Sequence, residues 1–130
     1  MNEKRWTLEW IPGTFSIARY GGDEPLPPWA VDSHVLMTVT RTQDELSIIA
    51  PDHNVPFNAQ AERGFVAMRV VEPLDFKQVG VIATLTRALA DAGISILAVS
   101  TYETDIILFR EEHKDAAREA LSAVADTSRL

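Results

Sequence analysis

The 130-residue chain contains no cysteine. Disulfides, thiolate nucleophiles and cysteine-ligated zinc or iron–sulfur sites are therefore excluded. Basic residues are also scarce, because 12 Lys and Arg stand against 19 Asp and Glu and give a net charge of −7. Proteins that bind nucleic acid or anionic membranes neutralise phosphates with basic surfaces. We therefore expect no nucleic-acid partner and no membrane partner.

Long hydrophobic runs are absent as well. The run Ile106–Phe109 is the length of a strand, whereas a membrane span needs about 20 apolar residues. The first six residues lack the apolar core of a signal peptide. We therefore expect a cytoplasmic protein. A hydrophobic fraction of 46% and a charged fraction of 24% are close to globular averages and argue against general disorder.

The second half of the chain has the clearer periodicity. Its expected elements are a strand at 65–71, a loop at 73–78, a helix at 79–92, strands at 94–101 and 105–111, and a helix at 114–125. Apolar residues at three- and four-residue spacing predict the central helix. Gly93 follows its last periodic residue and suits the left-handed position after a helix. This half is predicted to be a β-α-β-β-α unit.

The first half is less regular. Its expected elements are short strands at 8–10 and 14–20 with a turn at 11–13, a loop at 21–28, one helical turn at 29–31, and a hairpin of strands 35–42 and 45–50. Alternating β-branched residues predict the hairpin, and Pro12 with Gly13 favours a turn. The crossover helix expected beside such strands is shrunken or missing.

These patterns divide the chain at about residue 62. A single β-α-β-β-α unit leaves half of its sheet uncovered, so we expect residues 1–62 and 63–130 to complete one another's sheets. Exposed strand edges invite pairing with a further chain. We therefore predict a homodimer.

The start of the helix at 79–92 is the main candidate for a binding site. Unpaired backbone N–H groups and the helix dipole favour a carboxylate there, and Gly80 lets a ligand approach the backbone. If the two following strands are adjacent, Thr101 and Asp105 lie near this helix start, and Asp105 can neutralise an ammonium group. Together these groups suit an α-amino acid. The alternative is that Asp105 only caps the hairpin turn and that Thr101 and Thr104 only favour strand formation.

Two segments carry a resemblance to a known family. They are Ala92–Arg110 (AGISILAVSTYETDIILFR) and Leu36–Pro51 (LMTVTRTQDELSIIAP). With them the chain resembles the ACT-domain family of amino-acid-sensing regulatory modules, and more narrowly small bacterial tandem-ACT proteins and the cytosolic arginine sensors of the animal TOR pathway. The resemblance implies an α+β, ferredoxin-like ACT fold of two intertwined repeats, with antiparallel sheets and helices on one face. A degenerate N-terminal ACT-like repeat would span 1–62, and a C-terminal ACT repeat 63–130.

The resemblance also implies assembly by ACT–ACT pairing and a ligand groove between the helix start and the strand pair. The ligand-binding positions would be Gln78, Val79, Gly80, Val81, Thr101, Tyr102 and Asp105. The arginine sensors hold a guanidinium with extra acidic contacts. In the loop before the helix the nearest polar candidates are Asp75 and Gln78, which leaves the side chain of the ligand open.

Catalytic and metal-binding patterns are not visible in the sequence. His34, His53 and His113 lie on separate segments without ligand spacing. No serine has a nucleophile-elbow context, and no glycine-rich phosphate loop is present. We therefore predict no catalytic residue, no metal and no cofactor. The leading hypothesis is a non-catalytic sensor module that binds a small amino acid and signals to an unidentified protein partner. The alternative is a ligand-free ACT adaptor acting in protein–protein interaction, and an enzyme is disfavoured.

Overall fold

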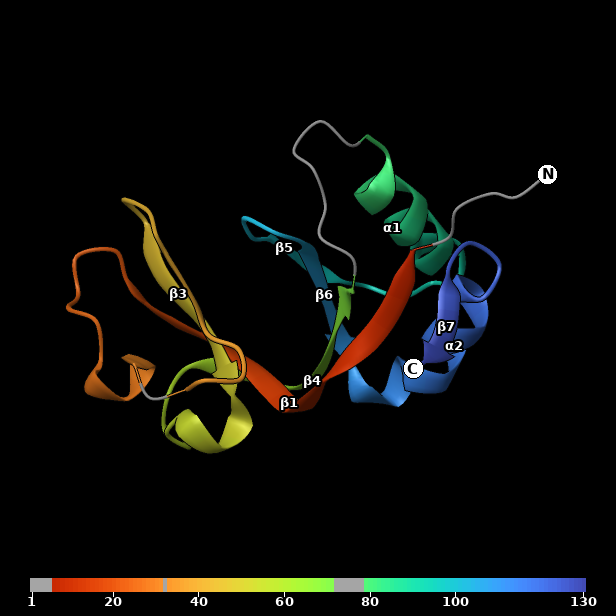
Figure 1. Cartoon of the computed structure of the whole chain (residues 1–130). Helices are drawn as coiled ribbons and strands as arrows, with labels where there is room; N and C mark the ends of the chain where they lie inside the picture. Colours follow the sequence, from red (N-terminus) through yellow and green to blue (C-terminus); the bar gives the residue numbers. More distant parts are fainter. Residues whose placement is uncertain (1–5, 32, 72–78) are drawn as a thin grey trace. The chain divides into compact units, whose positions relative to one another are not determined.

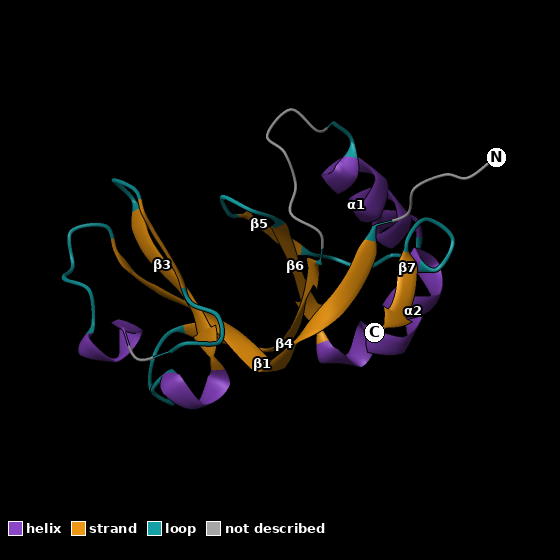
Figure 2. Cartoon of the chain, viewed as in Figure 1, coloured by secondary structure: helices purple, strands orange, loops and turns teal. Residues whose placement is uncertain are grey.

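The computed structural model describes residues 6–31, 33–71 and 79–130 (Figure 1). Its strands are β1 (Thr7–Gly21), β2 (Thr38–Arg41), β3 (Glu45–Pro51), β4 (Ala61–Val70), β5 (Leu97–Ser100), β6 (Asp105–Arg110) and β7 (Asp126–Arg129). Its α-helices are α1 (Val81–Asp91) and α2 (Lys114–Leu121), and its 3₁₀ helices are η1 (Pro28–Val31), η2 (Asp52–Asn54) and η3 (Glu111–His113) (Figure 2). The chain is α+β, as predicted.

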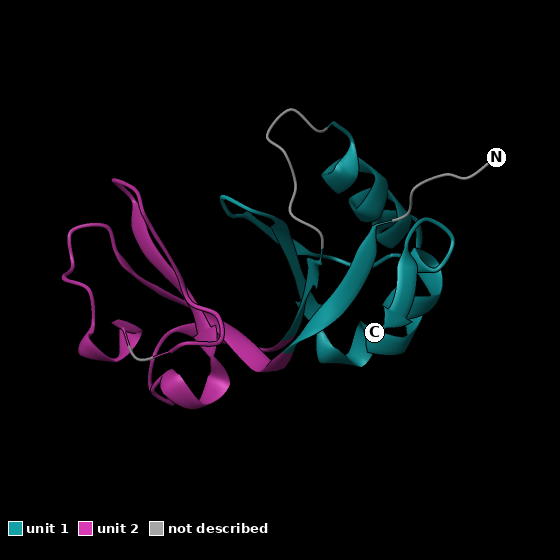
Figure 3. Ribbon diagram, viewed as in Figure 1, with its two compact units in different colours: residues 1–11, 66–130 teal, residues 12–65 magenta. Residues whose placement is uncertain are grey.

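The chain forms two compact units (Figure 3). Unit 1 contains residues 1–11 and 66–130, and unit 2 contains residues 12–65. The hydrogen-bonded strand order is β2-β3-β1-β4-β6-β5, with β7 beside β1. Both β1 and β4 contribute residues to each unit. These units do not coincide with the predicted repeats 1–62 and 63–130, because residues 6–11 fall in unit 1 and residues 63–65 in unit 2; the division into repeats stays a prediction.

Strand β1 continues through Pro12 and Gly13, so the predicted turn between two short strands is wrong. Gly13 adopts a φ of 99°, a conformation that glycine tolerates. The neighbours of β1 change around this point, because Thr7 pairs with β7 in parallel and the segment 15–21 pairs with β3 in antiparallel register. The irregular Pro-Gly step therefore lies where the strand passes from unit 1 to unit 2 and does not reverse the chain.

In unit 1, the two α-helices cover one face of the sheet, as predicted. Alternate residues of the strands and the apolar stripes of the helices form one core cluster, whose buried strand and helix members include Leu8, Val66, Met68, Val70, Ile107, Phe109, Val81, Leu85, Leu89, Ala117 and Leu121. Alternation along a strand places every second side chain on the same face. The apolar faces of the helices and of the strands therefore pack against each other in a single core.

Helix α1 is shorter than its predicted span of 79–92, because glycines define both of its ends. Gly80 precedes its first residue, and Gly93 follows it with a φ of 76°. The N–H of Gly93 donates to the Ala90 carbonyl at 2.9 Å, and the N–H of Ile94 donates to the Leu89 carbonyl at 3.0 Å. This pair of hydrogen bonds is the Schellman motif. Because the backbone N–H of Ile94 is bonded within this motif, Ile94 does not belong to a strand. Strand β5 begins at Leu97 and not at residue 94.

The end of the chain also differs from the prediction. Helix α2 ends at Leu121 and not at residue 125, and a short strand, β7, follows it. Strand β7 pairs in parallel with the beginning of β1. Its sequence, DTSR, has no apolar alternation that could have identified it. In addition, β4 begins at Ala61, four residues before its predicted start.

Unit 2 contains the predicted β2–β3 hairpin, with the first strand shortened from 35–42 to 38–41. Its core cluster combines strand residues with Ala30 of η1 and with Val55, which follows η2; the strand members are Ala18, Leu46, Ile48 and Ala50. The single helical turn expected at 29–31 is confirmed as η1. The described residues of unit 2 contain 3₁₀ helices and no α-helix, which agrees with the predicted loss of a crossover helix. Among all described residues, no helix is long and apolar enough to span a membrane.

Candidate functional site

The first turn of α1 is capped by glycine backbone and not by a side chain. Gly80 has a φ of 86° and a ψ of 0°, and its position makes no side-chain cap hydrogen bond. Its carbonyl accepts the N–H of Thr84 at 2.9 Å. The cap therefore supplies no side-chain acceptor for the amide groups that precede Thr84 at the start of the helix. Together with the helix dipole, these donors favour an anion.

The predicted residues around this helix start differ in what they can offer a ligand. Val79 is 89% exposed, so its side chain is accessible. Val81 is 4% exposed and belongs to the unit 1 core, which leaves only its backbone amide for a ligand. Gln78 and Asp75 lie outside the described residues. On this side, what the described residues offer is the backbone amides of the first turn of α1, a group of donors that favours anions.

The β5–β6 turn is held by threonines. The N–H of Thr101 donates to the Thr104 carbonyl at 2.8 Å, and the N–H of Thr104 donates to Oγ1 of Thr101 at 3.1 Å. Tyr102, between them, is 82% exposed. The two threonines therefore carry out the turn-closing role for which Asp105 was the alternative candidate.

Asp105 is the first residue of β6 and pairs in register with Ser100 of β5. The Ser100 hydroxyl donates to Oδ1 of Asp105 at 2.7 Å. The residue is half-buried. Since Ser100 occupies only one carboxylate oxygen, Oδ2 can accept a hydrogen bond from a cation.

Thr104 is a residue that sequence reasoning treated only as a strand former. Its Oγ1 donates to the carbonyl of Val70, the last residue of β4, at 2.8 Å. This hydrogen bond joins residues 34 positions apart. It fixes the β5–β6 turn to the end of β4, the strand that precedes α1 in the chain. Only the tertiary fold shows this link, because nothing in the local pattern relates the two positions.

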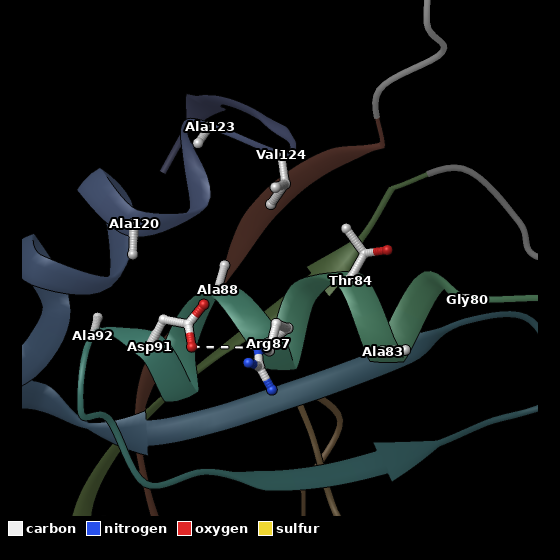
Figure 4. A pocket seen from close by; sticks show the side chains of 10 residues that line it. All are labelled: Gly80, Ala83, Thr84, Arg87, Ala88, Asp91, Ala92, Ala120, Ala123 and Val124. Carbon is white, nitrogen blue, oxygen red and sulfur yellow. Dashed lines mark ion pairs between the residues drawn. The ribbon is translucent and has the colours of Figure 1, made fainter.

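A groove of about 760 Å³ lies between α1 and α2 (Figure 4). Its lining residues are Gly80, Ala83, Thr84, Arg87, Ala88, Asp91, Ala92, Ala120, Ala123 and Val124. Gly80 is therefore at the groove, whereas Thr101, Tyr102 and Asp105 are not part of its lining. The structure thus places the described candidate residues in two groups, one at the start of α1 and one at the β5–β6 turn. Within the described ranges, no three His, Asp or Glu side chains are grouped as metal ligands.

Both groups lie in a segment with a recognisable family signature. Residues 60–123 match the family model of the ACT domain. Residues 13–58 match a second family model, described as an N-terminal domain. No curated protein sequence matches the chain. The C-terminal half of the chain is thus similar to an ACT domain, and this half contains α1 and the β5–β6 turn.

Solved structures show the same fold over nearly the whole chain. A protein from Agobacterium tumefaciens is 29% identical with a TM-score of 0.86, covering 93% of this chain and 90% of that one. A Vibrio cholerae protein of unknown function is 18% identical with a TM-score of 0.75, covering 92% and 89%. The ligand-free regulatory subunit of Thermus thermophilus aspartate kinase is 11% identical with a TM-score of 0.62, covering 92% and 98%. The predicted ferredoxin-like ACT fold is therefore confirmed, while the tandem repeat and the relation to arginine sensors stay predictions.

Proposed function

We propose that the chain is a non-catalytic regulatory module that binds a free α-amino acid between the start of α1 and the β5–β6 turn. The observation that carries the proposal is the glycine-capped start of α1 within the segment that matches the ACT domain. The ligand carboxylate accepts hydrogen bonds from the first-turn amides. The ligand ammonium donates to Oδ2 of Asp105, whose Oδ1 is held by Ser100.

The module acts by a shift in the populations of two conformational states. A ligand that bridges α1 and the β5–β6 turn favours the arrangement in which both contacts form, and its effect is limited to its difference in affinity between the two states. In this proposal the protein is a cytoplasmic homodimer, and a partner protein reads the arrangement. The fold similarity to a regulatory subunit supports the role without defining the ligand.

A thermal-shift screen against the common amino acids tests the proposal directly. A ligand present at about 100 times its Kd stabilises the native state by about 2.7 kcal/mol, which raises the Tm of a domain of this size by several degrees. One amino acid, or one chemical class, should produce this shift at millimolar concentration. A screen in which none does so contradicts ligand binding and favours the adaptor alternative.

Asp105 provides the residue-level test. Asp105→Asn keeps the size of the side chain and removes the charge that pairs with the ammonium, so the Kd should rise by about 30-fold or more. Glu103→Gln is the matched control, because Glu103 is an exposed acid in the same turn. Calorimetric titration with the amino acid found in the screen should show a loss of affinity for Asp105→Asn and none for Glu103→Gln. Equal affinities would remove Asp105 from the site.

A further inference from the structure

The two strands that both units share each contain a glycine in an unusual conformation. Gly13 lies within β1 with a φ of 99°, and Gly64 lies within β4 with a φ of 80°. Extended strands have negative φ values, so both strands depart from the extended conformation at these points. Among the described residues, the other two glycines with positive φ, Gly80 and Gly93, lie at the ends of α1 and outside any helix or strand.

These two glycines lie at a similar level of neighbouring strands. Strands β1 and β4 are adjacent in the sheet, and a backbone hydrogen bond joins them on either side of the glycines. The N–H of Val71 donates to the Thr7 carbonyl at 2.8 Å, and the N–H of Arg19 donates to the Gln60 carbonyl at 2.9 Å. The glycine of β1 is midway between Thr7 and Arg19, and the glycine of β4 lies between Gln60 and Val71. A line across the two strands therefore passes close to both glycines.

The boundary between the units crosses the strands at the same level. Unit 2 begins at Pro12 and ends at Phe65, so Gly13 follows its first residue and Gly64 precedes its last. Each unit has a core cluster of its own. A Cβ added at either glycine would meet no atom within 4 Å, so close packing does not explain glycine at these positions. Backbone freedom is the property that glycine supplies there.

We propose that Gly13 and Gly64 form a hinge at which β1 and β4 bend together, so that unit 1 changes its orientation relative to unit 2. Glycine adopts positive and negative φ about equally readily, so each strand can pass between the bent conformation and an extended one. Hinges are commonly a few residues that absorb a large change in φ and ψ. The hydrogen bonds on either side of the glycines can persist during this motion. The hinge does not depend on an amino-acid ligand, so failure of the ligand screen leaves it standing.

The absence of cysteine allows spin labels to be attached at two chosen positions of the full chain. Thr40→Cys places a label on an exposed residue of β2 in unit 2, and Glu119→Cys places one on an exposed residue of α2 in unit 1. Double electron–electron resonance then measures the distribution of distances between the labels. A positive φ is unfavourable for an L-residue, so alanine at either glycine should change the ratio of bent to extended chains about tenfold. Gly13→Ala combined with Gly64→Ala should therefore replace the wild-type distance with a second one.

Two substitutions are matched controls. Asparagine tolerates the left-handed conformation better than alanine does, so Gly64→Asn should shift the distances less than Gly64→Ala. Gly93 has a similar φ of 76° and an equally open Cβ position, but it lies within unit 1. Gly93→Ala should therefore lower the stability in the same way and leave the distances unchanged.

Each single alanine variant should show the second distance in smaller proportion, and these variants carry the test if the double variant fails to fold. Alanine variants with the wild-type distance distribution would overturn the proposal, and would show that the glycines form rigid bulges that only bend the strands. A shift that Gly93→Ala reproduces, or that is as large for Gly64→Asn as for Gly64→Ala, would also overturn it.

Discussion

Two glycines at opposite ends of α1 have the same backbone requirement and different roles. Gly80 has a φ of 86° and Gly93 a φ of 76°. A Cβ added at either position would meet no atom within 4 Å. The cost of an alanine is therefore conformational at both sites and not steric. Only Gly80 lies where the proposed carboxylate approaches the helix.

We predict that Gly80→Ala and Gly93→Ala each lower the free energy of unfolding by about 1–2 kcal/mol, because a left-handed conformation costs an L-residue about that much. Only Gly80→Ala should also weaken amino-acid binding, since its methyl group enters the space in front of the first-turn amides. Urea denaturation measures the first effect, and calorimetric titration measures the second. If both variants bind the ligand as the wild type does, the carboxylate does not lie at the start of α1.

Asp126 gives the chain a predictable response to acid. Its pKa is lowered from the ordinary value of 3.8, chiefly because the backbone N–H of Ser128 donates to the carboxylate, with smaller help from the Ser128 and Thr7 side chains. The N–H of Ser128 lies 3.0 Å from Oδ1. A lowered native pKa means that the ionised form stabilises the fold above the unfolded pKa, and that this stability is lost as the pH falls through the native pKa.

Asp126→Asn should therefore be less stable than the wild type at neutral pH, and the difference should shrink as the pH falls below about 4. Urea midpoints measured at pH 7 and at pH 3 check this. If the difference in urea midpoint between wild type and Asp126→Asn is the same at pH 3 as at pH 7, the carboxylate charge does not stabilise β7.

At the scale of elements, a long-range hydrogen bond joins the β5–β6 turn to β4. The Thr104 hydroxyl donates to the Val70 carbonyl at 2.8 Å. Thr104→Val keeps the shape of the side chain and removes the donor, so it should lower the free energy of unfolding by about 1 kcal/mol. Thr104→Ser keeps the donor and should recover most of the loss.

Hydrogen exchange gives this prediction its local readout. Amides of the β5–β6 turn should exchange faster in Thr104→Val than in Thr104→Ser, because local opening no longer breaks the bond to β4. Equal exchange of the turn in both variants would show that its position is set by strand pairing alone.

Elements with strong periodicity were predictable from the sequence, and elements defined by distant partners were not. Helix α1 and strand β3 have apolar patterns that match their buried residues, whereas β2 was predictable from its alternation although none of its residues is buried. Gly93 marked the helix end through its own backbone chemistry. Strand β7 has a polar sequence and exists because β1 lies beside it. The same distinction applies to the site. Gly80 and Asp105 could be selected from local chemistry, whereas the link from Thr104 to Val70 depends on two strands meeting in the fold.

For the whole molecule, the central feature is that the units share strands. β1 runs from Thr7 to Gly21, and the boundary between the units falls within it, after Ile11. The same is true of β4, whose residues belong to unit 2 up to Phe65 and to unit 1 from Val66. Neither unit can lose its sheet without releasing backbone hydrogen bonds in strands that continue into the other. We therefore expect the chain to unfold in one cooperative transition.

A substitution in unit 2 tests this cooperativity. A Cβ on Gly22 would lie 2.3 Å from the backbone oxygen of Gln43, too close for any real contact, whereas a Cβ on Gly21 would be no nearer than 3.5 Å to a flexible side chain. Gly22→Ala should therefore destabilise the chain by about 1–3 kcal/mol, and Gly21→Ala should cost less.

The tryptophans report the two units separately, because Trp6 and Trp10 belong to unit 1 and Trp29 to unit 2. In a Trp29→Phe background, fluorescence follows unit 1, and in a Trp6→Phe/Trp10→Phe background it follows unit 2. Gly22→Ala should shift the urea midpoint of both reporters equally, since coincident transitions are the mark of two-state unfolding. A shift confined to Trp29 would show that the units unfold independently, and that the shared strands β1 and β4 do not couple them.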